Sequence, residues 1–259
     1  MASQGWRHAA ERVYCRSPES IELRTMFTLL HQTPDFLVIC KHAGVSVHKD
    51  DNDQPLLAEV AAATGDKQLY LIHRLDKMTS GILLLGRHAK AAAELSGGFA
   101  RRDVQKFYLA ISSKKPKKKQ GTVIGDMSRS RRRSWKLDAT RENPAITQFI
   151  STAAGEGRRL FLCKPCTGKT HQIRVALKSV GAGITGDDIY GQEEADRGYL
   201  HAFALQFTFQ GQVWRFVCLP EQGSLWQVAQ VQAALSGWAT PWDISWPSLP
   251  SGLVKPRVD

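Results

Sequence analysis

Short apolar runs with the character of β-strands recur along most of this chain, and many of the connections between them are short. The run at 36–40, FLVIC, is continuous and typical of a buried strand, whereas VQKFYLAI at 104–111 alternates apolar and polar residues. The runs LHAFALQFTF and QVWRFVCLP are joined by Gln210-Gly211, which predicts a hairpin. Further strands are expected at 69–72, 81–86, 145–151 and 159–165. The predicted elements are mostly strands, with a few helices between them. This order predicts an α+β fold with a mixed, largely antiparallel sheet and flanking helices.

Helical periodicity is confined to a few stretches. Pro55 opens one helix, and Gly97 with Gly98 closes a second. A third begins after Thr170 and carries apolar residues at i, i+4 and i+7 on one face. The stretch 224–237 predicts one continuous last helix.

The charge of the chain is strongly positive. Lys and Arg together number 35 and Asp and Glu 24, a formal net charge of +11 over 259 residues. Such an excess favours an anionic partner, nucleic acid first and a membrane surface second. No apolar run approaches the ~18 residues that span a bilayer, and the first residues lack the apolar region of a secretory signal. The scattered, odd set of five cysteines is not a disulfide framework. We therefore expect a cytoplasmic protein without a membrane segment.

Several motif fragments fall short of a cofactor site. Cys163 and Cys166 form a CxxC, but zinc needs two further ligands at matching spacing and no second CxxC is present. TGKT at 167–170 lacks the glycine that a P-loop requires five residues before Gly168. The run GDDIYG at 186–191 is most simply a glycine turn. We expect no metal and no nucleotide cofactor.

The stretch HRLDKMTSG at 73–81 has a different character. It lies between the expected strands LYLI and GILLLG, so that a loop holds Asp76 with a hydroxyl at Thr79 and a flexible Gly81. Such a turn can present a carboxylate to a cleft. An Asp that merely caps a turn would explain Asp76 and Thr79. It would not explain a second stretch, TGKTHQIRVAL, which puts Arg174 near the start of an amphipathic helix.

Together these stretches resemble the RluA-type family of pseudouridine synthases. The family signature, His-Arg-Leu-Asp, two variable residues and Thr-Ser-Gly, matches 73–81 throughout. Its Tyr in a strand after a basic residue matches Tyr108, and its Thr-Gly-Arg/Lys-Thr-His-Gln-Ile/Leu-Arg matches 167–174. GDDIYG and LHAFALQF fit two further markers in the family's order. Ala176, where the family usually has His, and GAGITGD, where it often has His-Pro before the turn, depart from the pattern. Neither departure touches a residue expected in catalysis.

The resemblance implies an isomerase that converts a uridine of structured RNA, tRNA or rRNA, to pseudouridine in a central RNA-binding cleft. Uracil is cut from C1′ at N1, rotated and rejoined through C5, which needs no cofactor. By the same resemblance Asp76 is the catalytic carboxylate, either as nucleophile at C1′ or as base and charge stabiliser. Arg174 is its charge partner and Tyr108 lies against the uracil ring. Substrate contacts are further implied for Arg74, which fills the helix space left by the extruded base, for Thr79, and for Leu200 in the apolar wall.

Two other classes share some of these features. A non-catalytic RNA-binding or RNA-folding protein would carry the same positive charge, but it would not need Asp76, Tyr108 and Arg174 together. A glycosylase could use a similar carboxylate. We expect a monomer.

We expect an N-terminal extension at 1–33, a catalytic domain at 34–237 and a Pro- and Trp-rich tail at 238–259. Within the domain, 114–136 reads as a basic excursion that adds little to the core. Its cations form two groups separated by QGTVIGD, which suits a hairpin. RNA phosphates are then contacted by Arg131, Arg132 and Arg133, with Trp135 stacking on an unpaired base. A solvated loop is the alternative.

Overall fold

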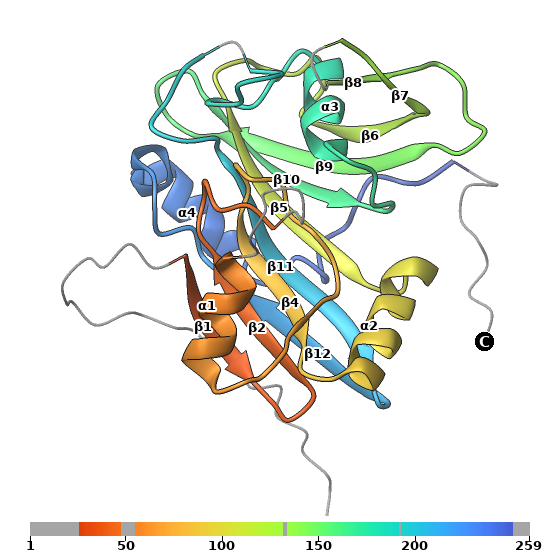
Figure 1. The fold of residues 1–259 in the computed structure, drawn as a ribbon. Coiled ribbons are helices and arrows are strands. Elements are labelled where there is room, and N and C mark those ends of the chain that lie inside the picture. Colours follow the sequence, from red (N-terminus) through yellow and green to blue (C-terminus); the bar gives the residue numbers. More distant parts are fainter. Residues whose placement is uncertain (1–25, 48–54, 132–133, 192, 251–259) are drawn as a thin grey trace, which may run out of the picture.

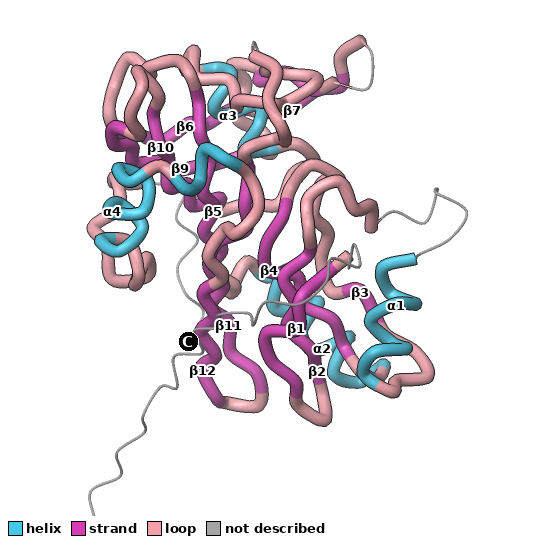
Figure 2. The backbone as a smooth tube through the Cα atoms, turned by 90° about the vertical axis from the view of Figure 1, so that its left-hand side faces the viewer, coloured by secondary structure: helices cyan, strands magenta, loops and turns pink. Residues whose placement is uncertain are grey.

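The structure is a computed structural model that describes residues 26–47, 55–131, 134–191 and 193–250. One sheet runs through the molecule, and the helices lie around its strands (Figures 1 and 2). Its strands follow the order β1 (Phe27–Gln32), β2 (Phe36–Lys41), β4 (Ser80–Gly86), β11 (Leu200–Phe209), β5 (Gln105–Ser112), β10 (Arg159–Pro165), β9 (Ala145–Ala153) and β6 (Gln120–Gly125). β3 (Tyr70–Leu71) pairs with β4, and β12 (Gln212–Val217) pairs with β11. Only the β4–β11 pair is parallel in this described sheet, so the expected mixed, largely antiparallel architecture is confirmed.

β4 is covered on both faces, which explains its unbroken apolar sequence. Ile82 and Leu84 join a cluster with α2 (Ala89–Arg101), and Leu83 and Leu85 join another with α1 (Pro55–Thr64). Alternate residues of a strand point to opposite faces of the sheet, so α1 and α2 lie on opposite sides of β4. This double burial fixes the strand that follows the turn of Asp76.

The other half of the sheet carries the largest apolar cluster. It combines β5, β9 and β10 with α3 (Gln172–Ser179), the 3₁₀ turn η1 (Ser224–Gln227) and α4 (Ala229–Gly237). Burial of Ile173 and Leu177 anchors α3 there, as its apolar periodicity predicts. Within the described residues, no helix is long and apolar enough to cross a membrane.

Two helix boundaries differ from the sequence prediction. α2 continues through Gly97 and Gly98, which keep helical backbone, and ends where Arg102 takes a left-handed conformation with φ 67°. The expected last helix is divided at Val228, whose extended backbone separates η1 from α4. The division lets both Trp226 and Val231 reach the core, where each is fully buried.

The basic excursion is more structured than predicted. Gln120–Gly125, which reads as a separator between cations, is the edge strand β6 paired with β9, and Val123 is buried in the core. A small separate hairpin follows, formed by β7 (Met127–Arg129) and β8 (Trp135–Leu137). Arg131 lies in its connection, and the expected contacts Arg132 and Arg133 fall outside the described residues. The excursion therefore contributes an edge strand and a partly buried hairpin, of which Leu137 packs against the large apolar cluster.

Both ends of the described chain join the sheet. β1, inside the stretch expected as an N-terminal extension, pairs antiparallel with β2. At the other end Trp238, Trp242 and Trp246 pack against the large apolar cluster, and the Gln148 side chain donates a hydrogen bond to the Pro247 carbonyl. The described part of the tail therefore packs as a strap on the domain.

Candidate active site

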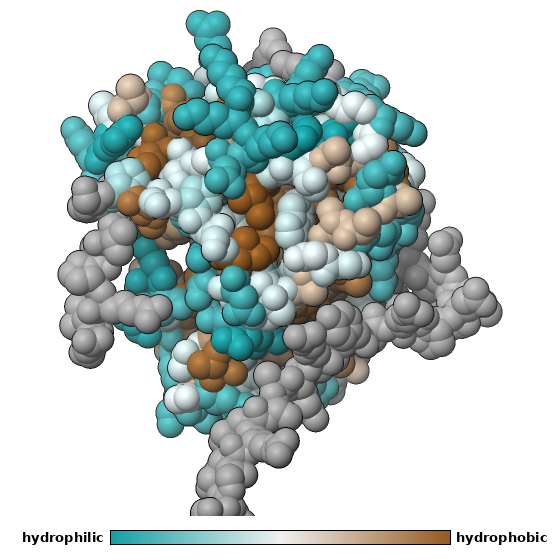
Figure 3. All heavy atoms as spheres, turned by 180° about the vertical axis from the view of Figure 1, so that it is seen from behind, coloured by the Kyte–Doolittle hydropathy of each residue, from teal (hydrophilic) through white to brown (hydrophobic). Residues whose placement is uncertain are grey.

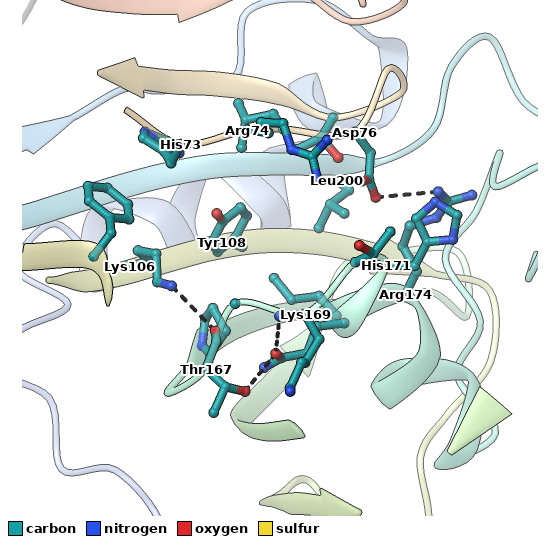
Figure 4. Close-up of a pocket in the computed structure, with 18 of the residues that line it drawn as sticks. His73, Arg74, Asp76, Lys106, Tyr108, Thr167, Lys169, His171, Arg174 and Leu200 are labelled. Carbon is teal, nitrogen blue, oxygen red and sulfur yellow. Dashed lines mark hydrogen bonds and ion pairs between the residues drawn. The ribbon is translucent and has the colours of Figure 1, made fainter. Parts of the chain in front are cut away.

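A cleft of about 600 Å³ opens between the β3–β4 loop on one side and the segment leading from β10 into α3 on the other. β5, the end of α2 and the start of β11 complete its lining. Figure 4 shows side chains from these elements gathered around it. Six side chains expected from the sequence line this cleft: Arg74, Asp76, Thr79, Tyr108, Arg174 and Leu200.

Asp76 occupies the first position of a tight turn between β3 and β4. The Thr79 N–H donates to the Asp76 carbonyl at 2.9 Å, which closes the turn. The Lys77 carbonyl accepts from the Gly44 N–H at 2.8 Å and from Lys41 Nζ at 3.4 Å, so the end of β2 and the loop after it hold the turn. The Asp76 side chain remains 24% exposed. Its carboxylate is held by a rigid backbone and is accessible from the cleft.

The Ser-Gly that follows the turn is explained by the close approach of β4 to β11. Ser80 hydrogen-bonds the His201 Nδ1 at 2.7 Å, and Arg197 donates to the Ser80 oxygen at 2.7 Å. Gly81 has φ 106°, and a Cβ there would lie 2.3 Å from the Ala202 carbonyl oxygen. Only glycine permits both the backbone angle and the contact. These two residues therefore fix where the turn of Asp76 enters the sheet.

Arg174 is the centre of the charge network, and its principal partner is Asp187. The guanidinium donates to both Asp187 oxygens at 2.7 Å, through Nε and Nη2. It reaches Asp76 Oδ2 through Nη1 at 3.3 Å and Asp188 Oδ1 through Nη2 at 3.2 Å. The ion pair with Asp76 implied by the family resemblance is therefore present, but it is the longest of the guanidinium's contacts to the three carboxylates. The GDDIYG turn does more than reverse the chain, because it supplies the buried anchor for Arg174.

Asp187 accepts hydrogen bonds from four donors. Besides the two bonds from Arg174, it accepts from the backbone N–H groups of Ile189 and Tyr190, each at 3.0 Å. Burial by itself would raise the pKa of this carboxyl, but the Arg174 hydrogen bonds and charge outweigh it and the pKa is lowered. Burial would likewise lower the pKa of Arg174, and the bonds to Asp187 raise it instead. The pair stays ionised and holds the guanidinium in one orientation.

Tyr108 forms the floor of the cleft from β5. It is the register partner of Ala202 on β11, one strand away from the turn of Asp76. Burial first, and the charge of Asp76 second, raise the pKa of the Tyr108 hydroxyl well above its ordinary value. Tyr108 is therefore a neutral phenol that can donate a hydrogen bond, beside an apolar wall to which Leu200 contributes.

Several cleft residues had no role assigned from the sequence, although His73 belongs to the motif at 73–81. The His73 ring stacks on Phe99 with centroids 4.6 Å apart, and its Nε2 accepts from the Leu84 N–H at 3.1 Å. Burial lowers the pKa of His73 to about 3, with Lys106 second, so this ring is neutral. Lys106 donates to the Thr167 carbonyl at 3.3 Å. The basic residue before Tyr108 in the family pattern was the one available signal for Lys106.

The described residues contain no group of three or more His, Cys, Asp or Glu side chains placed to hold a metal. What the cleft offers is a partly exposed carboxylate beside a fixed guanidinium, a neutral phenol and a basic rim. This arrangement suits proton transfer or nucleophilic attack by Asp76 on a substrate that is anionic around its reacting centre.

Comparison with known proteins places these features in a family. Residues 35–179 match the family model of RNA pseudouridylate synthases, a range that runs from before β2 through α3. The chain is 48% identical over 200 residues to an uncharacterized RNA pseudouridine synthase of Haemophilus influenzae, covering 76% of this chain and 89% of the relative. It is 31% identical over 200 residues to the ribosomal large subunit pseudouridine synthase C of Escherichia coli strain K12, covering 71% and 62%.

Solved structures agree with this. The human RNA pseudouridylate synthase domain containing 1 superimposes with a TM-score of 0.64 at 25% identity, over 85% of this chain and 98% of that one. The human RNA pseudouridylate synthase domain containing 4 shares the fold with a TM-score of 0.62 at 24% identity, over 79% and 91%.

Proposed function

The chain belongs to the RluA-type RNA pseudouridine synthases, isomerases that act on RNA, and on that premise we propose that Asp76 is its catalytic carboxylate. Asp76 would attack C1′ of the target uridine or act there as base and charge stabiliser while uracil rotates and rejoins through C5. The observation that carries the proposal is that the two carboxylates bound to Arg174 differ in burial and in hydrogen bonding. Asp187 is buried and accepts four hydrogen bonds, whereas Asp76 is accessible and contacts the guanidinium only through Nη1.

The cleft supports a flipped nucleotide as the reacting unit. A base inside a helix is not accessible to a carboxylate at the bottom of a cleft, so it must first leave its stack. Tyr108 and Leu200 offer a flat ring and an apolar contact for the extruded uracil, and Thr79 lies beside Asp76. We propose that Arg74, at the same rim, fills the space that the extruded base leaves in the RNA helix.

We further propose that the substrate is a structured ribosomal or transfer RNA. The relative from Escherichia coli is named for the large ribosomal subunit, which favours ribosomal RNA. Hydrophilic side chains predominate in the upper part of the face seen from behind in Figure 3, the half that holds β6–β9 in Figure 1. The hairpin β7–β8 adds Arg129 with its guanidinium 5.7 Å from the Trp135 ring centre. A cation on an aromatic ring suits a phosphate beside an unpaired base.

Pseudouridine mapping tests this proposal directly. RNA from cells lacking the gene is mapped at single-nucleotide resolution beside RNA from the parent strain, and the deletion is complemented with wild type, Asp76→Asn or Asp243→Asn. Asp243 is an exposed carboxylate in the C-terminal strap. We expect one or a few uridines to lose modification, with restoration by wild type and Asp243→Asn only. Restoration by Asp76→Asn would refute the catalytic role of Asp76.

A further inference from the structure

His171 has an unusual backbone conformation at the start of α3. Its φ of 57° and ψ of 17° are left-handed, a region that non-glycine residues rarely occupy. Such residues cluster at functional sites, where the surrounding structure holds them in place. The half-buried His171 side chain lines the cleft, in the same wall as Arg174 (Figure 4). The strained backbone therefore places an imidazole in the candidate active site.

Hydrogen bonding through Tyr190 assigns the tautomer of that imidazole. The Trp135 backbone N–H can only donate, and it donates to the Tyr190 hydroxyl oxygen at 2.7 Å. The hydroxyl proton has no other acceptor among the described residues, so it is directed at His171 Nδ1, 2.9 Å away. With Nδ1 as acceptor, the neutral ring carries its proton on Nε2. Burial first, and Arg174 second, lower the pKa of His171, which favours this neutral form.

The Nε2–H has no hydrogen-bond partner among the described residues. The opposite side of the ring is held by the hydrogen bond between Nδ1 and the Tyr190 hydroxyl. Tyr190 is itself fixed, because its N–H donates to Asp187 at 3.0 Å and the Arg174 guanidinium lies 5.0 Å from its ring centre. The donor is therefore oriented by the same network that orients Arg174.

We propose that His171 is a substrate-binding residue whose Nε2–H donates a hydrogen bond to an oxygen of the uridine in the cleft, and that Tyr190 is the positioning residue that holds its ring. The inference rests on the proposed role of the Asp76 cleft. The acceptor is either a uracil carbonyl or the ribose 2′-hydroxyl. Because Trp135 binds the same hydroxyl, docking of the hairpin β7–β8 and orientation of His171 are coupled.

Glycine and asparagine substitutions separate the hydrogen bond from the backbone. His171→Gly accepts the left-handed angle and leaves a ring-sized space, while His171→Asn tolerates the angle and keeps an amide donor. The substrate is a transcript carrying the mapped uridine, and melting temperatures confirm that each variant is folded. We expect His171→Gly to lower kcat/KM about tenfold, the scale of one buried hydrogen bond, and added imidazole to restore part of it. His171→Asn and Tyr190→Phe should lose less.

The controls distinguish this proposal from that for Asp76. Imidazole should leave wild type unchanged and should not restore Asp76→Asn. A kcat/KM for His171→Gly within twofold of wild type would overturn the inference, as would an equal loss in the Gly and Asn variants that imidazole does not reduce. A transcript with 2′-deoxyuridine at the target identifies the acceptor. The penalty of His171→Gly disappears there if the acceptor is the 2′-hydroxyl, and persists if it is a uracil carbonyl.

Discussion

Two acidic turns meet at Arg174, and they treat their carboxylates in opposite ways. The turn after β3 leaves Asp76 24% exposed, with one contact of 3.3 Å to the guanidinium. The turn after α3 buries Asp187 completely, with two contacts of 2.7 Å to the same guanidinium and two backbone donors. Asp187 accepts four hydrogen bonds, three of them at Oδ1, whereas Asp76 accepts one long contact from the guanidinium and stays accessible to a substrate.

The difference shows how one arginine can serve structure and chemistry together. A guanidinium held by a single flexible carboxylate would follow that carboxylate, but Asp187 holds Arg174 in a fixed orientation. Asp76 therefore meets a cation that is already oriented and that does not need to move during the reaction. The two turns should accordingly respond differently to substitution.

The largest effect is expected for Asp76→Asn. The variant removes the reacting group, so turnover should fall by at least about a thousandfold, within the range for loss of a catalytic acid or base. The ion pair that is lost is one long contact of a partly exposed carboxylate, so the free energy of unfolding should change by less than about 1 kcal/mol. Single-turnover assays and denaturant unfolding measure the two quantities. Turnover within a few-fold of wild type would sink the assignment.

Arg174→Leu should damage both properties. It leaves the fully buried Asp187 without its cation, and breaking a buried pair costs about 3–5 kcal/mol. Turnover should fall as well, because Asp76 loses its oriented partner. The double variant Arg174→Leu/Asp187→Leu separates the effects, since it removes the buried charge and should regain stability while activity stays low. Unchanged stability in Arg174→Leu would contradict the role assigned to Asp187.

Asp187→Asn should affect stability more than Asp76→Asn and turnover less. Its amide would present an N–H to a guanidinium that also donates, at a cost of about 3 kcal/mol for a buried charged group. Activity should fall only as far as Arg174 loses its orientation. Unfolding and turnover measured in parallel on Asp187→Asn and Asp76→Asn test this prediction. It is contradicted if both variants lose mainly stability or both lose mainly turnover.

The pH dependence of stability also tests the contribution of the ionised Asp187 carboxylate, with a smaller expected effect. Because the pKa of Asp187 is lowered in the folded protein, its contribution is fully present above the ordinary carboxyl pKa. It is lost as pH falls through the lowered folded value. Wild type should therefore lose stability in this acidic range, and the double variant Arg174→Leu/Asp187→Leu should show a shallower decline. Urea unfolding at a series of acidic pH values measures it; equal slopes would contradict the prediction.

The smallest effect on chemistry is expected at the basic hairpin, far from both turns in sequence. Replacing Arg131, Arg132 and Arg133 by Ser should weaken RNA binding. It should also reduce the slope of the logarithm of the binding constant against the logarithm of the salt concentration, by about 1 for each lost phosphate contact. Turnover at saturating RNA should change little. Lys67→Ser with Lys90→Ser, two exposed lysines elsewhere, is the control. A salt slope that stays at the wild-type value in the triple variant would restore the solvated-loop interpretation.

Local sequence determined the frame around Asp76. An unbroken apolar run predicts β4, since a strand covered by helices on both faces needs apolar residues throughout. A turn between two such strands must lie at an end of the sheet, and Gly81 marks where a neighbouring backbone comes too close for any Cβ. The motif match then singled out Asp76 and Arg174, and the structure brings them to 3.3 Å although 98 residues separate them.

Only the tertiary structure decided what these residues face. Asp187 reads locally as part of a glycine turn, and its burial against Arg174 follows from the docking of two segments. QGTVIG has too little apolar character to predict a strand, yet it becomes β6 because the edge of β9 offers it backbone hydrogen bonds. The backbone of His171 is likewise set by its surroundings, through Tyr190 and the hairpin beyond it. Local patterns report which side chains are buried, whereas the pairing of buried charges depends on contacts between segments that sequence spacing does not record.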